Sequence, residues 1–153
     1  DRATSGVMIC AKNESTLKYL QKQFQDRKVQ KSYIAITSQR PKEEEAVIDA
    51  PIGRNLKDPK KFHVTAEGKS AQTTYKVLES STKKSKILLL PHTGRTHQLR
   101  IHLAYINCPI IGDELYGGDK NERLLLHAKS LKISLPGNID MLFESPLPEG
   151  FEI

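Results

Sequence analysis

The stretch Gly94-Arg95-Thr96-His97-Gln98-Leu99-Arg100-Ile101-His102-Leu103 decides how this chain folds and where its chemistry lies. Its two leucines, Leu99 and Leu103, recur at helical spacing, so the stretch predicts a helix that runs to Tyr105 and is stopped by Pro109. Free backbone N–H groups at the start of that helix, together with two arginines, favour binding of an anion there. The alternative is an ordinary helix start whose arginines form surface ion pairs.

The segments on either side of this stretch read as strands joined by polar turns. Alternating or apolar runs predict strands over 7–11, 31–37, 46–50, 71–79, 87–90, 124–135 and 141–144. The last two are joined by Pro136-Gly137-Asn138, a strong turn signal. The segment Gly53–Phe62 has no clear period and is expected to be an extended basic loop. Together these elements predict a single α+β domain over 1–153, with a mixed, mostly antiparallel sheet.

Two helices are expected, and each has candidate capping residues. The first follows the strand over 7–11, and its cap is Asn13, Ser15 or Thr16. We expect Leu17, Leu20 and Phe24 to form its apolar face. The second helix, within the stretch quoted above, is expected to take Thr93 or Thr96 as its cap.

Composition restricts the functional classes but does not choose among them. The 24 lysines and arginines exceed the 18 acidic residues, which gives a net charge of +6 and favours a polyanionic partner over a merely solvated basic face only weakly. No apolar run approaches the roughly 20 residues of a membrane helix, so no membrane contact is expected. Cys10 and Cys108 are isolated, which argues against a disulfide scaffold and indicates a reducing, cytoplasmic setting.

The quoted stretch resembles a signature motif of the RluA family of pseudouridine synthases. Further similarities occur in family order and cover nearly the whole chain: Asp1-Arg2-Ala3-Thr4-Ser5-Gly6-Val7, Lys31-Ser32-Tyr33, Gly68-Lys69-Ser70-Ala71, Pro109-Ile110-Ile111-Gly112-Asp113, Tyr116-Gly117-Gly118 and Leu126-His127-Ala128. The resemblance implies the family's catalytic fold and an RNA-modifying isomerase that uses no cofactor. It also implies an RNA substrate, with ribosomal RNA favoured and transfer RNA as the alternative.

The resemblance assigns catalytic roles to three residues. Asp1 matches the family's catalytic aspartate, Arg100 its basic partner and Tyr33 its active-site tyrosine. The roles are chemically reasonable, because a guanidinium favours the ionised form of a neighbouring carboxylate and a tyrosine ring can stack on an extruded base. For Tyr33 the alternation of the strand alone would predict an ordinary core position, and only the Lys-x-Tyr match favours the active site.

A second group of residues is expected to bind the substrate. Leu99 resembles the apolar wall beneath the base, although its helical spacing allows a core position equally well. The remaining candidates are basic: Arg2, Arg54, Lys57, Lys60, Lys61 and Arg95. The alternative for the basic loop Gly53–Phe62 is a solvated surface turn that does not contact RNA. No metal site is expected, because the five histidines form no HExxH pattern and no CxxC accompanies them.

The family pattern is incomplete at one end, since the His-Arg-Leu that precedes the aspartate in the family is not in this chain. We therefore expect the catalytic domain to lack its N-terminal part, and the chain alone to be inactive unless that segment is supplied, for example as a separate chain. Two other functions compete with catalysis. One is a non-catalytic RNA-binding module derived from a synthase, and the other is a basic protein-interaction domain.

Overall fold

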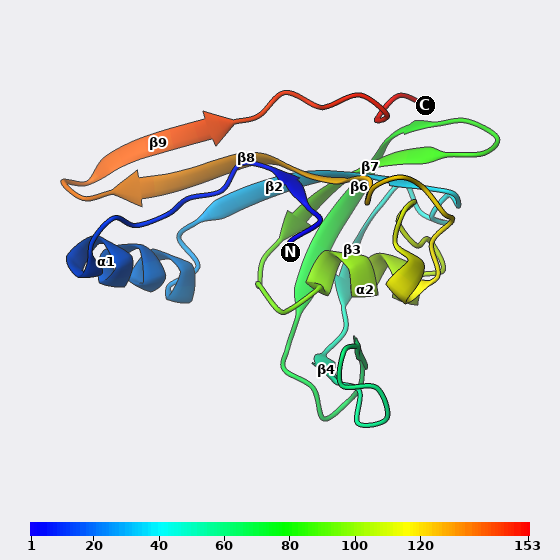
Figure 1. Ribbon diagram of the computed structural model, residues 1–153, viewed down its shortest axis with the longest axis horizontal. Coiled ribbons are helices and arrows are strands. Elements are labelled where there is room, and N and C mark those ends of the chain that lie inside the picture. Colours follow the sequence, from blue (N-terminus) through cyan, green and yellow to red (C-terminus); the bar gives the residue numbers. More distant parts are fainter.

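A computed structural model describes all residues of the chain, 1–153, and its main element is a seven-stranded, mostly antiparallel sheet (Figure 1). The strand order is β1-β8-β2-β7-β6-β3. Strands β1 and β9 both pair with the edge of β8 that faces away from β2. The β1–β8 pair is parallel, and all other pairs in the sheet are antiparallel. The predicted α+β class is thereby confirmed. The elements are β1 (Ser5–Gly6), α1 (Glu14–Gln25), β2 (Gln30–Thr37), β3 (Glu45–Asp49), β4 (Ile52–Arg54), β5 (Phe62–Val64), β6 (Gln72–Ser80), β7 (Ser85–Pro91), α2 (Gln98–Tyr105), the 3-10 helix η1 (Glu114–Tyr116), β8 (Leu126–Leu135) and β9 (Ile139–Glu144).

The central strands are those that the sequence predicts most clearly. β6 and β7 are adjacent as expected, with Tyr75 opposite Leu89, and β7 pairs on its other side with β2. The apolar run of β7 alternates in burial. Ile87 and Leu89 are fully buried, whereas Leu90 is 38% exposed, because it points to the other face of the sheet.

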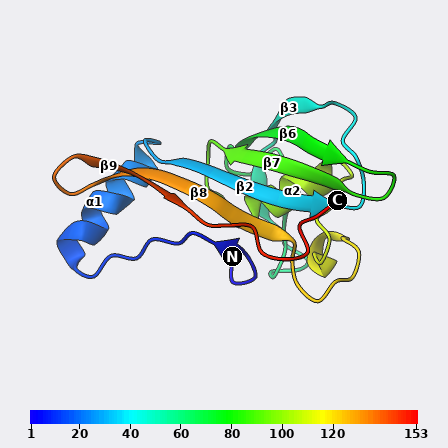
Figure 2. The ribbon, with the colours of Figure 1, turned by 90° about the horizontal axis from the view of Figure 1, so that it is seen from above.

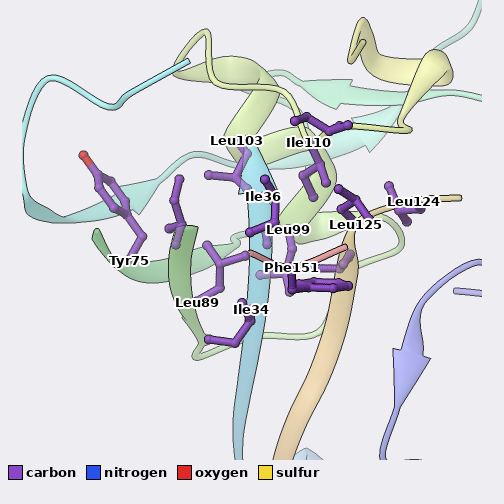
Figure 3. Close-up of a cluster of buried hydrophobic side chains, with 14 of the residues drawn as sticks. Ile34, Ile36, Tyr75, Leu89, Leu99, Leu103, Ile110, Leu124, Leu125 and Phe151 are labelled. Carbon is purple, nitrogen blue, oxygen red and sulfur yellow. The ribbon is translucent and has the colours of Figure 1, made fainter. Parts of the chain in front are cut away.

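The main core lies between α2 and the centre of the sheet, where 16 buried residues pack together (Figure 3). Ile34 and Ile36 of β2 contribute to it with Leu99 and Leu103 of α2. The C-terminal segment returns to this core and places Phe151 within it, only 2% exposed. Phe151 therefore fastens the end of the chain to the sheet.

Both helices lie on the same side of the sheet, α2 across its middle and α1 near the far end of β8 and β9 (Figures 1 and 2). Asn13 caps α1 through its side-chain oxygen, which decides among the three predicted caps. The predicted apolar face is wrong in part. Leu20 is buried, but Leu17 and Phe24 are 45% and 42% exposed, because the helix turns Tyr19 rather than Leu17 toward the sheet.

The predicted strand over 7–11 is wrong. Only Ser5–Gly6 pairs with β8, and after Val7 the chain leaves the sheet edge, which β9 occupies from Ser130 onward. Val7 and Ile9 still pack against the small core beneath α1, whereas Met8 is 83% exposed. The apolar run therefore packs against this small core without pairing with a neighbouring strand.

The segment Gly53–Phe62 is more ordered than predicted. Its two ends belong to β4 and β5, which form a separate two-stranded sheet, so the expected extended loop is a hairpin with a basic tip. This hairpin projects away from the main sheet (Figure 1). No helix in the structure is long and apolar enough to span a membrane.

Candidate active site

The segment before α2 is held in place by one buried glutamine rather than by the expected threonine cap. The residue that precedes the helix is His97, which has a left-handed backbone (φ 55°) and no side-chain cap, so the prediction of Thr93 or Thr96 is wrong. Instead the Gln98 Oε1 accepts hydrogen bonds from the Thr93 hydroxyl (2.7 Å) and the Arg95 N–H (3.0 Å). The loop is thus tied to the first turn of the helix.

The same glutamine begins a chain of buried hydrogen bonds beneath α2. Its Nε2 donates to the Thr73 hydroxyl at 3.0 Å, and that hydroxyl lies 2.9 Å from His102 Nδ1. His102 Nε2 lies 3.0 Å from the Ala50 carbonyl and must donate to it, so Nδ1 accepts from Thr73 in the neutral imidazole. Burial lowers the pKa of His102, which agrees with this neutral form. The network fixes α2 against β6.

Arg100 projects from α2 and joins two carboxylates. Its Nε and Nη2 donate to the two oxygens of Asp113, each at 2.7 Å, and its Nη1 faces Asp1 Oδ2 at 3.4 Å. The first pair has the bidentate geometry of a strong arginine–carboxylate interaction, while the second is long. The Arg100 and Asp113 side chains are 11% and 1% exposed. Asp113 therefore positions the guanidinium, and Asp1 receives the N–H group that remains.

The loop that carries Asp113 depends on a glycine. Gly112 has φ +84°, and a Cβ there would lie 2.0 Å from the Arg123 carbonyl oxygen, so no other residue fits without a shift of the backbone. The Asp113 N–H donates to the Ile110 carbonyl, and the Asp113 carbonyl accepts from Tyr116 and Gly118. The tight turn thereby directs the carboxylate toward α2.

His97 and Tyr116 lie beside the two acids. The Tyr116 hydroxyl is 2.7 Å from His97 Nδ1, and the Tyr116 ring lies under the Arg100 guanidinium at 5.0 Å. Burial, and secondarily the charge of Arg100, lowers the pKa of His97, so its 3.7 Å approach to Asp1 is not an ion pair near neutral pH. When Tyr116 donates to Nδ1, the imidazole proton lies on Nε2, the nitrogen that faces Asp1.

Asp1 lies at a cavity of about 350 Å³ that is lined by the N-terminal segment, the start of α2 with the loop before it, and strands β2 and β8. Tyr33 of β2 and Leu99 of α2 line this cavity, and Arg95 lies on its wall. Tyr33 is half-buried, and burial raises its pKa, so the phenol stays protonated near neutral pH. The structure thus brings together Asp1, Tyr33, Arg100, Leu99 and Arg95.

The remaining predicted residues lie elsewhere. Arg2 is exposed and does not line the cavity. Arg54, Lys57, Lys60 and Lys61 belong to the β4–β5 hairpin and its turn, outside the cavity. Arg54 packs its guanidinium 5.3 Å from the centre of the Phe62 ring. The hairpin reaches the site only indirectly, because the Phe62 ring lies edge-on to His97 and the Phe62 N–H donates to Tyr116.

β1 fixes the position of Asp1. Gly6 has φ +107°, and a Cβ there would lie 2.2 Å from the Ala128 carbonyl oxygen, so the strand can approach β8 only with glycine. Next to it, the Ser5 hydroxyl accepts from Arg123 Nη2 (2.6 Å) and bonds His127 Nδ1 (2.9 Å). These contacts hold residues 1–6, and with them Asp1, beside α2.

Sequence reasoning gave no role to Asp113, Tyr116 or His97. A signal for Asp113 was present, since an acidic residue that follows the apolar pair Ile110-Ile111 after a single glycine is well placed to be buried opposite an arginine. Tyr116 was marked only by the Tyr116-Gly117-Gly118 match, which gave it no role. Its place depends on how the loop after α2 folds back. No cluster of three or more His, Cys, Asp or Glu side chains that could hold a metal ion is present.

Comparison with known proteins agrees with this fold. The family model described as RNA pseudouridylate synthase matches residues 1–105. The chain is 43% identical over 158 residues to ribosomal large subunit pseudouridine synthase D of Borreliella burgdorferi, covering 100% of this chain and 48% of that protein. It is 36% identical over 157 residues to an RNA pseudouridine synthase of Zymomonas mobilis, covering 99% of this chain and 72% of that one.

The solved structures lead to the same group. Human RNA pseudouridylate synthase domain containing 1 superimposes with a TM-score of 0.85 at 31% identity, covering 95% of this chain and 66% of that one. The chain therefore belongs to the RNA pseudouridylate synthase family, and the comparisons confirm the RluA type that its motifs indicated. It spans about half the length of most of the curated relatives it matches.

Proposed function

We propose that this chain carries the catalytic centre of an RNA pseudouridine synthase, which converts uridine to pseudouridine with Asp1 as its nucleophile. The observation that supports this most directly is the Asp1 carboxylate, which faces Arg100 Nη1 at 3.4 Å beside the cavity that Tyr33 lines. A carboxylate that is held in place but not fully paired has lone pairs free for the substrate. We further propose that residues 1–153 belong to one catalytic domain.

The reaction must break the bond between N1 of uracil and C1′ of the ribose, rotate the base and join C1′ to C5. Asp1 has two routes. It can attack C1′, which expels the uracil anion and forms an ester, or it can remove the C2′ proton, which expels the same anion and leaves a glycal. In the first route C5 attacks C1′ and displaces the Asp1 carboxylate from the ester; in the second, C5 bonds to C1′ of the glycal and Asp1 returns the proton to C2′. In both routes the proton on C5 is then lost and N1 gains a proton. The sum is an isomerisation that needs no cofactor.

Arg100 acts chiefly as a positioning group for the nucleophile in this account. Its charge is already balanced by Asp113, so its effect on Asp1 comes from one N–H group held in a fixed direction. Neutral His97 adds a second N–H that faces the other oxygen of Asp1. These two contacts, at 3.4 and 3.7 Å, orient the carboxylate and leave its lone pairs free for attack on a single carbon.

The lining of the cavity suits an extruded uridine. Tyr33 provides a flat ring and Leu99 an apolar surface, and between them a uracil can stack while its sugar faces Asp1. Structured RNA is the proposed substrate, with large-subunit ribosomal RNA favoured by the names of two relatives and transfer RNA as the alternative. We place this activity in the cytoplasm.

The function is tested by incubating the full-length protein with transcripts of ribosomal and transfer RNA and mapping pseudouridines chemically. We expect pseudouridine at one or a few defined positions, and none when Asp1→Asn replaces the wild type. If a correctly folded protein binds these RNAs and forms no pseudouridine in any of them, the chain is an RNA-binding module instead. If it does not bind them either, the basic protein-interaction reading gains support.

A further inference from the structure

A second pocket, of about 330 Å³, adjoins the candidate active-site cavity. The two share four lining residues, Lys31, Thr93, Gly94 and Arg95, so they are neighbouring parts of one depression. The second pocket continues from this shared wall to the end of α1. Phe24, Gln25, Arg27 and Val29 line it there, and His92, which follows β7, completes it. Nothing in the proposed isomerisation uses this part of the depression.

The lining of the second pocket is basic and contains no acidic residue. Arg27, Lys31 and Arg95 contribute the positive charges, and none of the three forms an ion pair in the structure. Arg95 donates through Nε to the Ser70 carbonyl, which orients its guanidinium without neutralising it. Three uncompensated cations around a concave surface attract an anion.

The position of Arg27 is fixed by the end of α1. The Lys28 N–H donates to the Gln23 carbonyl and the Arg27 N–H to the Phe24 carbonyl, which is the hydrogen-bond pattern of a Schellman motif. Arg27 has φ +55°, the left-handed conformation that this motif requires. Because of this turn, Arg27 lines the second pocket, whereas its neighbour Lys28 lines a different depression on the molecule.

Gly94 keeps the passage between the two pockets open. Its φ is not positive, and a Cβ there would meet nothing within 4 Å except the Lys31 Nζ at 3.5 Å. Neither the backbone conformation nor close packing therefore requires glycine at this position. What the glycine provides is space beside the lysine, where a chain that occupied both pockets would have to pass.

We propose that the second pocket is a phosphate subsite, in which Arg27, Lys31 and Arg95 bind the backbone of the nucleotide next to the one that enters the cavity. This inference rests on the proposed function, because it takes an RNA nucleotide as the occupant of the first pocket. Lys31 and Arg95 touch both pockets and link the two. Arg27 lines only the second, so its contribution can be measured apart from catalysis.

The first test compares two neighbouring cations in the full-length protein. Arg27→Asn removes the charge with a residue that adopts the left-handed conformation readily, Lys28→Asn makes the same change outside the pocket, and Arg27→Lys restores the charge. The probe is fluorescein-labelled nonauridylate, and its affinity is measured over a salt series. We expect Arg27→Asn to weaken binding roughly twofold to fivefold and to flatten the slope of log affinity against log salt concentration by about 0.7. Lys28→Asn should leave both the affinity and the slope unchanged. Arg27→Lys should recover most of the affinity and most of the slope. Equal effects of Arg27→Asn and Lys28→Asn would overturn the subsite.

The second test places the phosphate. In a transcript that the full-length protein modifies, single methylphosphonate linkages remove one backbone charge at a time on either side of the target uridine. We expect one neutral linkage adjacent to that uridine to abolish the penalty of Arg27→Asn, because the two changes then remove the same interaction. Arg27→Asn should raise KM and leave kcat unchanged. Additive effects at every adjacent linkage would contradict the subsite while leaving isomerisation intact, and absence of isomerisation in the wild type would contradict the proposed function instead.

Discussion

Two basic regions of this molecule hold their arginines and lysines in different ways. In α2, the Arg100 side chain is 11% exposed and makes two 2.7 Å bonds to a carboxylate that is almost fully buried. In the β4–β5 hairpin, Lys61 approaches Asp58 only at 4.0 Å, with both side chains about 40% exposed. One cation is fixed in a single direction, and the other is free to move.

The difference follows from what each region must do. A carboxylate that reacts at one carbon must be held to a fraction of an ångström, and buried, fully hydrogen-bonded partners provide that precision. Contacts to phosphates tolerate looser geometry, because attraction to a polyanion depends mainly on charge. We therefore expect substitutions around Arg100 to change stability and turnover, and substitutions in the hairpin to change RNA binding alone.

The largest expected effect comes from making the same substitution in both regions. Asp113→Asn leaves the buried Arg100 with only the long 3.4 Å contact to Asp1 as a counter-charge, and it should reduce the free energy of unfolding by about 3–5 kcal/mol. Asp58→Asn removes an exposed partner of Lys61 and should cost about 0–1 kcal/mol. Urea denaturation of the two variants measures both values. Similar costs would show that Arg100 is no more tightly held than the hairpin.

The second expected effect concerns the hydrogen bonds that fix the start of α2. Gln98→Ala removes the partner of Thr93, of the Arg95 N–H and of Thr73, and each buried group left unpaired costs about 1–3 kcal/mol. Gln21→Ala, at an exposed position of α1, should stay within about 0.5 kcal/mol of the wild type. Thermal unfolding of both variants, with turnover, tests this difference. A Gln98→Ala protein as stable as Gln21→Ala would show that the network does not hold the loop.

The pH dependence of stability gives a third, smaller effect. Burial lowers the pKa of His102, so its neutral form predominates in the folded protein to lower pH than in the unfolded chain. Between the two pKa values the unfolded chain binds more protons, so this contribution is complete above about pH 6.5 and is lost as the pH falls below it. Denaturation at pH 7 and at about pH 5 should show the loss, reduced in His102→Gln and kept in the hairpin control His63→Gln. An unchanged loss in His102→Gln would remove His102 as its source.

The smallest expected effect on stability is at the hairpin tip. Replacing Arg54, Lys57, Lys60 and Lys61 by glutamine should keep the free energy of unfolding within about 1 kcal/mol. RNA affinity should nevertheless fall, and the log–log salt slope should flatten by roughly one unit for each phosphate that the tip no longer binds. The choice of uridine should change much less, because binding to the RNA backbone carries little sequence information. An unchanged slope would assign the tip to solvent.

The sequence predicted the centre of the sheet better than its edges. Runs such as 31–37 and 71–79 are rich in β-branched and aromatic residues, and β2 and β6 match them to within a residue or two. The run at 7–11 is as apolar as a strand, but whether it pairs depends on which segment reaches the edge of β8 first. β9 follows β8 after a tight turn and pairs with that edge. The sequence of 7–11 alone does not indicate that another strand occupies the edge.

For the site, motif resemblance predicted which residues gather but not how they are held. Asp1, Tyr33 and Arg100 lie together, as those motifs suggested. The bidentate partner of Arg100 is Asp113, thirteen residues further along the chain, and its place depends on a turn that Gly112 permits. Interactions of this kind are set by loop geometry in three dimensions, so helical or strand periodicity does not reveal them.

The central claim is that Asp1 reacts with the substrate while other residues bind the RNA. It is tested most directly by measuring turnover and RNA affinity together for Asp1→Asn in the full-length protein. We expect turnover to fall to background while the dissociation constant stays within a few fold of the wild type, because the carboxylate acts in the transition state and does not bind phosphate. Turnover close to that of the wild type would contradict the account.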